Sequence, residues 1–156
     1  MAKKKAKTSK KISSKPSLRE KPKVVSVVAC DSIVQQQAPS GKTMLVGVFD
    51  RINVTNPKRP FRPFSVMTKL FGGSGKFRVG IQIQTPSRAK KQHTEDDVEI
   101  NCSPEEMIQG IMTVASLDVS EDGFVNFFVT LDGKRAGIPC PVKIVHIETE
   151  EPTDSD

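Results

Sequence analysis

Two segments of this sequence alternate apolar and polar residues with a period of two, which restricts the fold more than any other feature. The segments are KFRVGIQIQ, spanning 76–84, and FVNFFVTLDG, spanning 124–133. Alternation of this kind predicts strands that bury one face against a core. The apolar positions that share a face are Phe77, Val79, Ile81 and Ile83 in the first segment and Val125, Phe127, Val129 and Leu131 in the second.

Two further runs, VVSVVAC from Val24 and TMLVGVFDRINV from Thr43, are rich in β-branched residues and more continuously apolar. This composition predicts strands that are covered on both faces. Turn-forming residues separate the runs, and Asp132-Gly133 suits the positive φ angles of a type I′ hairpin. Short strands at this spacing predict an all-β fold, an antiparallel β-sandwich of immunoglobulin-like or related type.

The segment SPEEMIQGIMTVASLDV, spanning 103–119, is compatible with two structures. Ser103, Pro104 and Glu106 fit the capped first turn of a helix. Gly110 and several β-branched residues disfavour a helix interior. We favour a strand over about 111–119, with at most one helical turn before it, and a helix over 103–112 stays the alternative.

Charge is concentrated at the two ends of the 156-residue chain. Residues 1–23 carry ten basic residues and one acid, whereas residues 148–156 carry five acids and no base. Segments of this composition bury too little apolar area to offset the entropy lost on ordering. We therefore predict a disordered basic tail over 1–23, a sandwich domain over 24–147 and a disordered acidic tail over 148–156.

Gly41-Lys42-Thr43 resembles the end of a phosphate-binding loop, but its surroundings do not fit one. That loop needs a glycine five residues before Gly41 and a helix after the lysine. The sequence has Gln36 at the first place and a strand-like run at the second. The same two tests fail at Gly75-Lys76, so we interpret both sites as hairpin turns.

An apolar strand ending in Ala29-Cys30-Asp31 is followed by the Gly41-Lys42 turn and then LVGVFDRI, from Leu45 to Ile52. With EDGFVNFFVTLDGK near the end, this pattern resembles a family of uncharacterised small bacterial proteins carrying a domain of unknown function. The resemblance covers about 24–147. It implies an all-β sandwich and no assigned activity.

Residues suited to catalysis or metal binding are sparse. His93 and His146 each begin a His-x-Glu triplet, but the Cys-x-x-Cys that completes a zinc deaminase site is missing. Cys30, Cys102 and Cys140 are widely spaced, which predicts free thiols in a reducing compartment. We expect no enzymatic activity, no cofactor and no metal. No apolar run is long enough to span a membrane, so we predict a soluble, cytoplasmic protein.

Carboxylates near the predicted strand ends could bind Ca²⁺, but each also has a structural interpretation. Asp122 and Asp132 precede glycines and suit turns that bond their own backbone. Asp31 and Asp50 end or interrupt apolar strands. We expect these two to be structural, with Arg51 or backbone donors over 35–40 as their partners.

Basic residues suggest a second hypothesis, which is non-specific binding of nucleic acid. The loop RINVTNPKRPFRPF places basic side chains near Phe61 and Phe64, as single-strand binding requires, although both rings could instead enter the core. A lysine-rich tail attracts phosphates without reading sequence. The candidate residues are Lys3, Lys4, Lys5, Lys7, Lys10, Lys11, Lys58, Arg59 and Arg62.

Our principal functional hypothesis is a non-enzymatic interaction module that binds an unknown protein partner. Its motivation is the strand pattern together with the absence of a convincing catalytic spacing. The sequence does not determine the oligomeric state.

Overall fold

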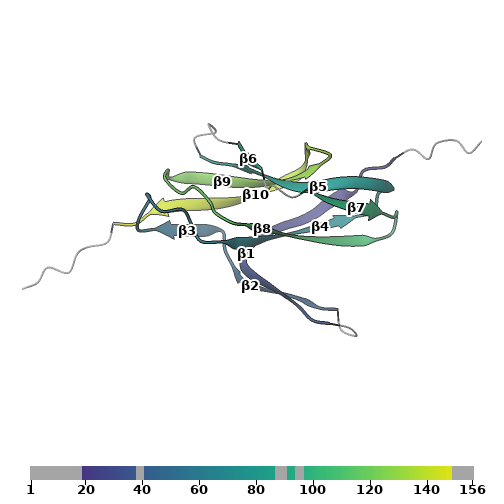
Figure 1. Cartoon of the computed structure of the whole chain (residues 1–156), viewed down its shortest axis with the longest axis horizontal. Coiled ribbons are helices and arrows are strands. Elements are labelled where there is room, and N and C mark those ends of the chain that lie inside the picture. The colour runs from purple at the N-terminus through teal and green to yellow at the C-terminus, as the bar shows by residue number, and fades with distance from the viewer. Residues whose placement is uncertain (1–18, 38–40, 87–90, 94–96, 149–156) are drawn as a thin grey trace, which may run out of the picture.

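The computed structural model describes residues 19–37, 41–86, 91–93 and 97–148, with only the backbone described over 91–93. In these ranges the chain is all-β, and the predicted two-sheet sandwich is confirmed (Figure 1). The strands are β1 (Lys23–Gln35), β2 (Thr43–Val48), β3 (Arg51–Val54), β4 (Phe64–Phe71), β5 (Gly75–Gln84), β6 (Lys91–His93), β7 (Val98–Cys102), β8 (Met107–Val114), β9 (Gly123–Leu131) and β10 (Lys134–His146).

The strands form two sheets that pack face to face. The first sheet has the order β2-β1-β4-β8, and the second has the order β3-β10-β9-β5-β6, with β7 also paired to β5. The pairings are antiparallel except for β3 beside β10, which run parallel with Ile52 next to Ile144. The consecutive strands β4 and β5 lie in different sheets, so the chain crosses the sandwich at 72–75.

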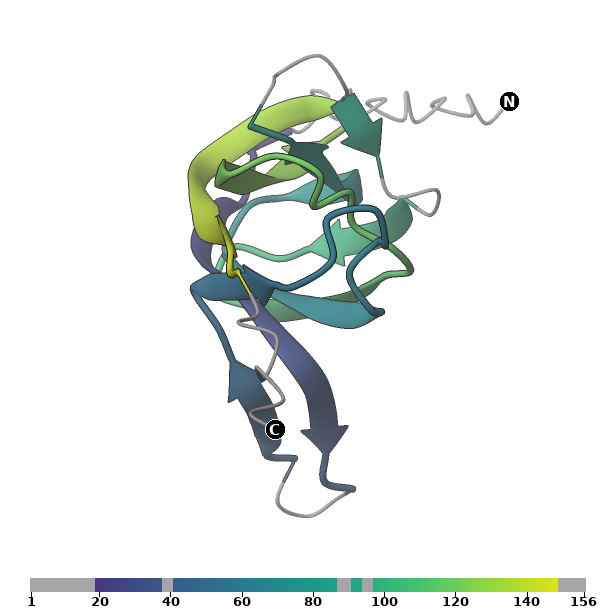
Figure 2. The same cartoon turned by 90° about the vertical axis from the view of Figure 1, so that its left-hand side faces the viewer.

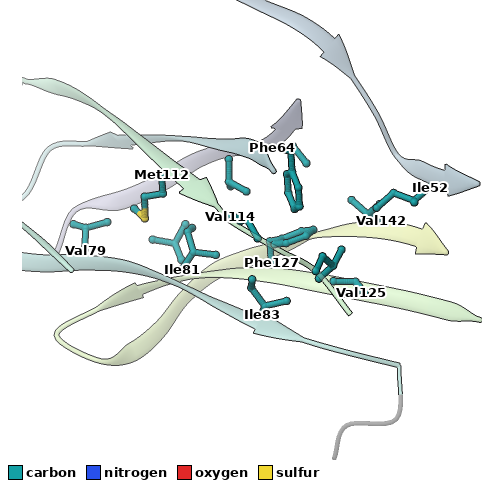
Figure 3. Packing of buried hydrophobic residues seen from close by; sticks show 14 of the residues in the cluster. Ile52, Phe64, Val79, Ile81, Ile83, Met112, Val114, Val125, Phe127 and Val142 are labelled. Atoms are coloured by element: carbon teal, nitrogen blue, oxygen red, sulfur yellow. The ribbon is translucent and has the colours of Figure 1, made fainter. Parts of the chain in front are cut away.

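The core lies between the two sheets and contains the predicted apolar faces of β5 and β9 (Figure 3). All eight alternating residues predicted for these strands are at most 2% exposed. Phe64 of the first sheet meets Phe127 of the second edge to face, with ring centroids 5.6 Å apart. Aromatic contacts of this geometry add to the stabilisation from buried area.

The ambiguous segment over 103–119 forms a strand and not a helix. Residues 103–106 make a turn in which the Glu106 N–H donates to the Ser103 carbonyl, and β8 begins at Met107. The strand starts about four residues before the predicted position and ends at Val114. Gly110 is required there because a Cβ atom would lie 2.7 Å from the Thr68 hydroxyl oxygen.

Two predicted hairpins have different outcomes. Asp132 and Gly133 have φ angles of 51° and 75° and join the paired strands β9 and β10, so the type I′ prediction is confirmed. The turn at Gly75 is not a hairpin, because it connects strands of different sheets. A glycine-rich turn permits either connection, and the sequence pattern alone does not distinguish them.

Residues 19–23, which composition placed in the basic tail, pack against the domain. The Arg19 guanidinium lies 4.0 Å from the Phe77 ring centroid and 2.9 Å from an Asp132 carboxylate oxygen. The Glu20 carbonyl accepts a hydrogen bond from the Ser74 N–H. A Cβ atom at Gly73 would lie 2.7 Å from the Pro22 nitrogen, so the two segments are in close contact.

The expectation that β1 and β2 are covered on both faces is wrong. Val25, Met44, Val46 and Val48 are 45–60% exposed. β1 pairs with β4 only as far as Cys30, beside Ser65, and beyond that point its ladder partner is β2. The apolar run therefore continues past the edge of the sandwich, where the described part of the chain offers no second layer.

Candidate interaction surface

The distal half of β1 and the whole of β2 form a two-stranded ribbon, which we call the arm and describe over residues 31–37 and 41–48. Its strands pair antiparallel from Cys30 beside Val48 to Gln35 beside Thr43. Figure 2 shows the paired strands extending away from the rest of the sandwich. A two-stranded ribbon is marginally stable alone in water, so contacts at its base and along its faces decide how firmly it is held.

One face of the arm points away from the domain and is apolar. Directly opposed residues share a face in an antiparallel pair, which places Ser32 beside Val46 and Val34 beside Met44. The four apolar residues on this side are 45–60% exposed, and none of its residues is charged. We call this side the arm face, and its residues are Ser32, Val34, Met44, Val46 and Val48.

The opposite face of the arm is turned toward the domain. Ile33, Thr43 and Leu45 on this side are half-buried. The Gln109 side-chain amide of β8 donates a hydrogen bond of 3.0 Å to the Thr43 hydroxyl. This contact attaches the distal part of the arm to the first sheet.

The base of the arm is fixed by Asp31. Its carboxylate lies 2.7 Å from an Arg62 guanidinium nitrogen in the loop before β4. It also packs directly over Gly47, where a Cβ atom would lie 2.7 Å from Asp31 Cγ and where φ is +65°. The charged partner is Arg62 and not the predicted Arg51, and of the predicted backbone donors over 35–40, residues 38–40 lie outside the described part.

The predicted basic loop presents fewer nucleic-acid contacts than its composition suggested. Phe64 is buried, and Phe61 is half-buried with its ring centroid 5.9 Å from that of Phe64, so these rings belong to the core. Arg59 and Arg62 line one cleft of about 540 Å³, but Arg62 is paired with Asp31. Lys58 is exposed and does not line this cleft.

The remaining candidate lysines, which are Lys3, Lys4, Lys5, Lys7, Lys10 and Lys11, lie outside the described residues. The structure therefore brings together two of the predicted nucleic-acid-binding residues, Arg59 and Arg62. It places Lys58 nearby in the same loop.

The Gly41-Lys42 turn is the end of the arm and not a phosphate-binding loop. Gly41 has a φ of +55°, and the Lys42 carbonyl accepts a hydrogen bond from the Gln36 N–H. A strand follows at Thr43, whereas phosphate binding needs the N-terminus of a helix. The predicted hairpin is confirmed here.

The three thiols are poor nucleophiles by their surroundings. Cys30 and Cys102 are buried, and burial raises the pKa of each. Cys140 lies between two prolines and follows an irregularity in the β9–β10 pairing, and desolvation raises its pKa too. A raised thiol pKa lowers the fraction of reactive thiolate at neutral pH.

His146 and Asp122 join the end of β10 to the segment before β9. A ring nitrogen of His146 lies 2.8 Å from the Val119 carbonyl oxygen, and the His146 N–H donates to the Asp122 carboxylate. Asp122 thus bonds a distant backbone and not its own turn. The side chain of His93 is outside the described part, and no cluster of three or more metal-binding side chains occurs among the described residues.

These features define a small β-sandwich domain with a projecting two-stranded arm. A family model described as a family of unknown function, DUF6941, matches residues 25–143, and the chain belongs to this family. This confirms the resemblance drawn from the Gly-Lys turn and the LVGVFDRI segment. No curated protein matches the chain. Among the described residues, no helix is long and apolar enough to cross a membrane.

The arm face was missed by sequence reasoning, although one signal could have indicated it. Lys42 is the only charged residue between Ser32 and Val48. Natural edge strands commonly carry charges or prolines that prevent pairing with other chains. The strand segments 32–35 and 43–48 carry neither, so they lack this protection.

Proposed function

We propose that this protein is a non-enzymatic interaction module that binds a protein partner through the arm face. The observation that carries this proposal is an uncharged apolar surface on a ribbon that is attached at both ends. Arg62 holds its base through Asp31, and Gln109 holds its distal part through Thr43. A surface held in this way loses little conformational entropy on binding, so more of the contact energy becomes affinity.

The arm face suits an uncharged apolar surface on the partner. Contiguous exposed apolar surface on a folded domain commonly marks a site of protein interaction. The raised pKa values of the three thiols support a role without a cysteine nucleophile. Binding, and not bond making, is the chemistry that this surface offers.

Site-specific photo-cross-linking in the native host tests the proposal. A photoreactive amino acid at Val48, 60% exposed on the arm face, should give a discrete cross-linked protein. The matched control is Phe124, which is 55% exposed on β9 of the other sheet. The adduct should weaken when Val46→Lys is introduced into the Val48 probe. No adduct at Val48, or the same adducts from both probes, would contradict the proposal.

Non-specific binding of nucleic acid through the basic tail is a second candidate function. Ten basic residues within 1–23 favour it, because each phosphate neutralised releases counterions. A chain beginning at Arg19 keeps the packed segment and removes the six candidate lysines. On duplex DNA the full chain should show the steeper salt dependence of affinity, and equal slopes for the two chains would contradict a role for the tail.

A further inference from the structure

Among the described residues, no part of this chain covers the arm face. The segments outside the described residues are 1–18, 38–40, 87–90, 94–96 and 149–156. Ile12 and Leu18 are their only large aliphatic residues apart from Met1, and lysines and acids dominate the two ends. None of these segments has the alternating apolar pattern of a strand that could pack on an uncharged apolar surface. An occupant from another chain therefore suits this surface better than these segments do.

We infer that the occupant is a second copy of this protein, with two arms packed antiparallel about a twofold axis. This inference rests on the proposed function and assigns its partner. In a twofold dimer the same surface of each copy contacts the other, so this surface must be complementary to itself. The arm face meets this requirement because it is apolar and contains no charge that would repel the same charge in the mate.

The pattern along β2 selects one alignment of the two arms. When Val46 lies on the twofold axis, Met44 of each copy faces Val48 of the other. All three exposed apolar residues of β2 then meet apolar residues. An axis shifted by two residues in either direction would leave one end of this apolar row against the polar tip or the base of the arm.

Charge at the ends of the arm supports the same alignment. With Val46 on the axis, Lys42 at the tip of one arm faces Asp50 at the base of the other. Both residues are exposed, and neither forms a side-chain ion pair among the described residues. The dimer thus places opposite charges together twice, whereas a parallel alignment of the arms would place Lys42 beside Lys42.

Sedimentation equilibrium of the full chain over the micromolar range tests this assignment. The unmodified protein should dimerise, and Val46→Lys should weaken the dimer at least about 100-fold, because two lysines would be buried without partners. The matched control is Val98→Lys on β7, where the native valine is 50% exposed, and this variant should dimerise normally. Circular dichroism should show the same strand content for all three proteins.

Charge reversal adds a test of the alignment. Lys42→Glu alone should weaken the dimer by roughly 5-fold, and adding Asp50→Lys should restore it. A monomeric wild-type protein, or a dimer disrupted by Val98→Lys and not by Val46→Lys, would overturn the assignment to a second copy. A monomer that still gives a cross-linked partner from Val48 would leave the proposed function standing with a different occupant. Failure of both experiments would contradict the proposed function itself.

Discussion

Replacing Gly47 with alanine should destabilise the domain by about 2–3 kcal/mol through two separate effects. A φ of +65° at this position costs a residue with a Cβ atom about 1 kcal/mol or more. The added methyl group would also lie 2.7 Å from Asp31 Cγ, and relieving this clash moves the carboxylate away from Arg62. Overpacking of this kind typically costs about 1–3 kcal/mol.

The substitution should lower the free energy of unfolding of the whole domain, and not only loosen the arm. Two residues after Gly47, Phe49 packs on the core, with its ring centroid 5.5 Å from that of Phe64. Its N–H also donates to the Ala29 carbonyl of β1. For a domain of this size, a loss of 2–3 kcal/mol corresponds to a fall in Tm of roughly 10 °C.

A double-mutant cycle in urea separates the two effects. Asp31→Ala removes an ion pair that is only partly buried and should cost about 0.5–1 kcal/mol. The double variant lacks the carboxylate atoms that make the closest contacts, and a Cβ–Cβ approach of 3.0 Å remains. The double should therefore be more stable than the sum of the singles predicts, by about 1 kcal/mol. Additive effects, or a Gly47→Ala variant as stable as the native protein, would refute this account of the base of the arm.

Three further results are expected. Phe127→Ala should cost about 3–5 kcal/mol in urea unfolding because it empties the centre of the core, and a loss below 1 kcal/mol would contradict the packing. A backbone N–H and Arg19 lower the pKa of Asp132 from 3.8, so this carboxylate stabilises the fold at neutral pH. The Asp132→Asn variant should therefore have a lower Tm than the native protein at neutral pH. This difference in Tm should disappear as the pH falls through the lowered pKa, and a difference that does not depend on pH would contradict the prediction. A chain beginning at Arg19 should melt like the full chain, whereas one beginning at Val24 should melt several degrees lower; equal melting of the two would show that residues 19–23 contribute nothing.

Residues that alternate along a single strand were predictable because the signal is local. Phe77 through Ile83 have one apolar and one largely polar face, and Val125 through Leu131 have an apolar residue at every second position, which determines the orientation of each strand toward a core. The Asp132-Gly133 hairpin is local in the same sense. Its turn type depends on two adjacent residues that tolerate positive φ.

The arm was not predictable from the same kind of evidence. A continuously apolar strand covered by a second layer and an apolar strand that projects past the sheet have the same local pattern. Only the strand pairing in the folded structure shows that β1 stops pairing with β4 at Cys30. Beyond this point nothing in the described chain covers Val34 or Val46. The Asp31–Arg62 pair was missed for a related reason, because its members are 31 positions apart and meet only in the folded chain.

Cross-linking through Val46 tests the central claim most directly. In the inferred dimer this residue lies beside its own mate on the twofold axis, so Val46→Cys should form a covalent dimer rapidly with a short bis-maleimide. Gln35→Cys, exposed on the other face of the same arm, is the matched control. The native protein, whose cysteines are buried or half-buried, gives the background. The account predicts fast cross-linking for Val46→Cys alone; equal or faster cross-linking through Gln35→Cys, or none through Val46→Cys, would contradict it.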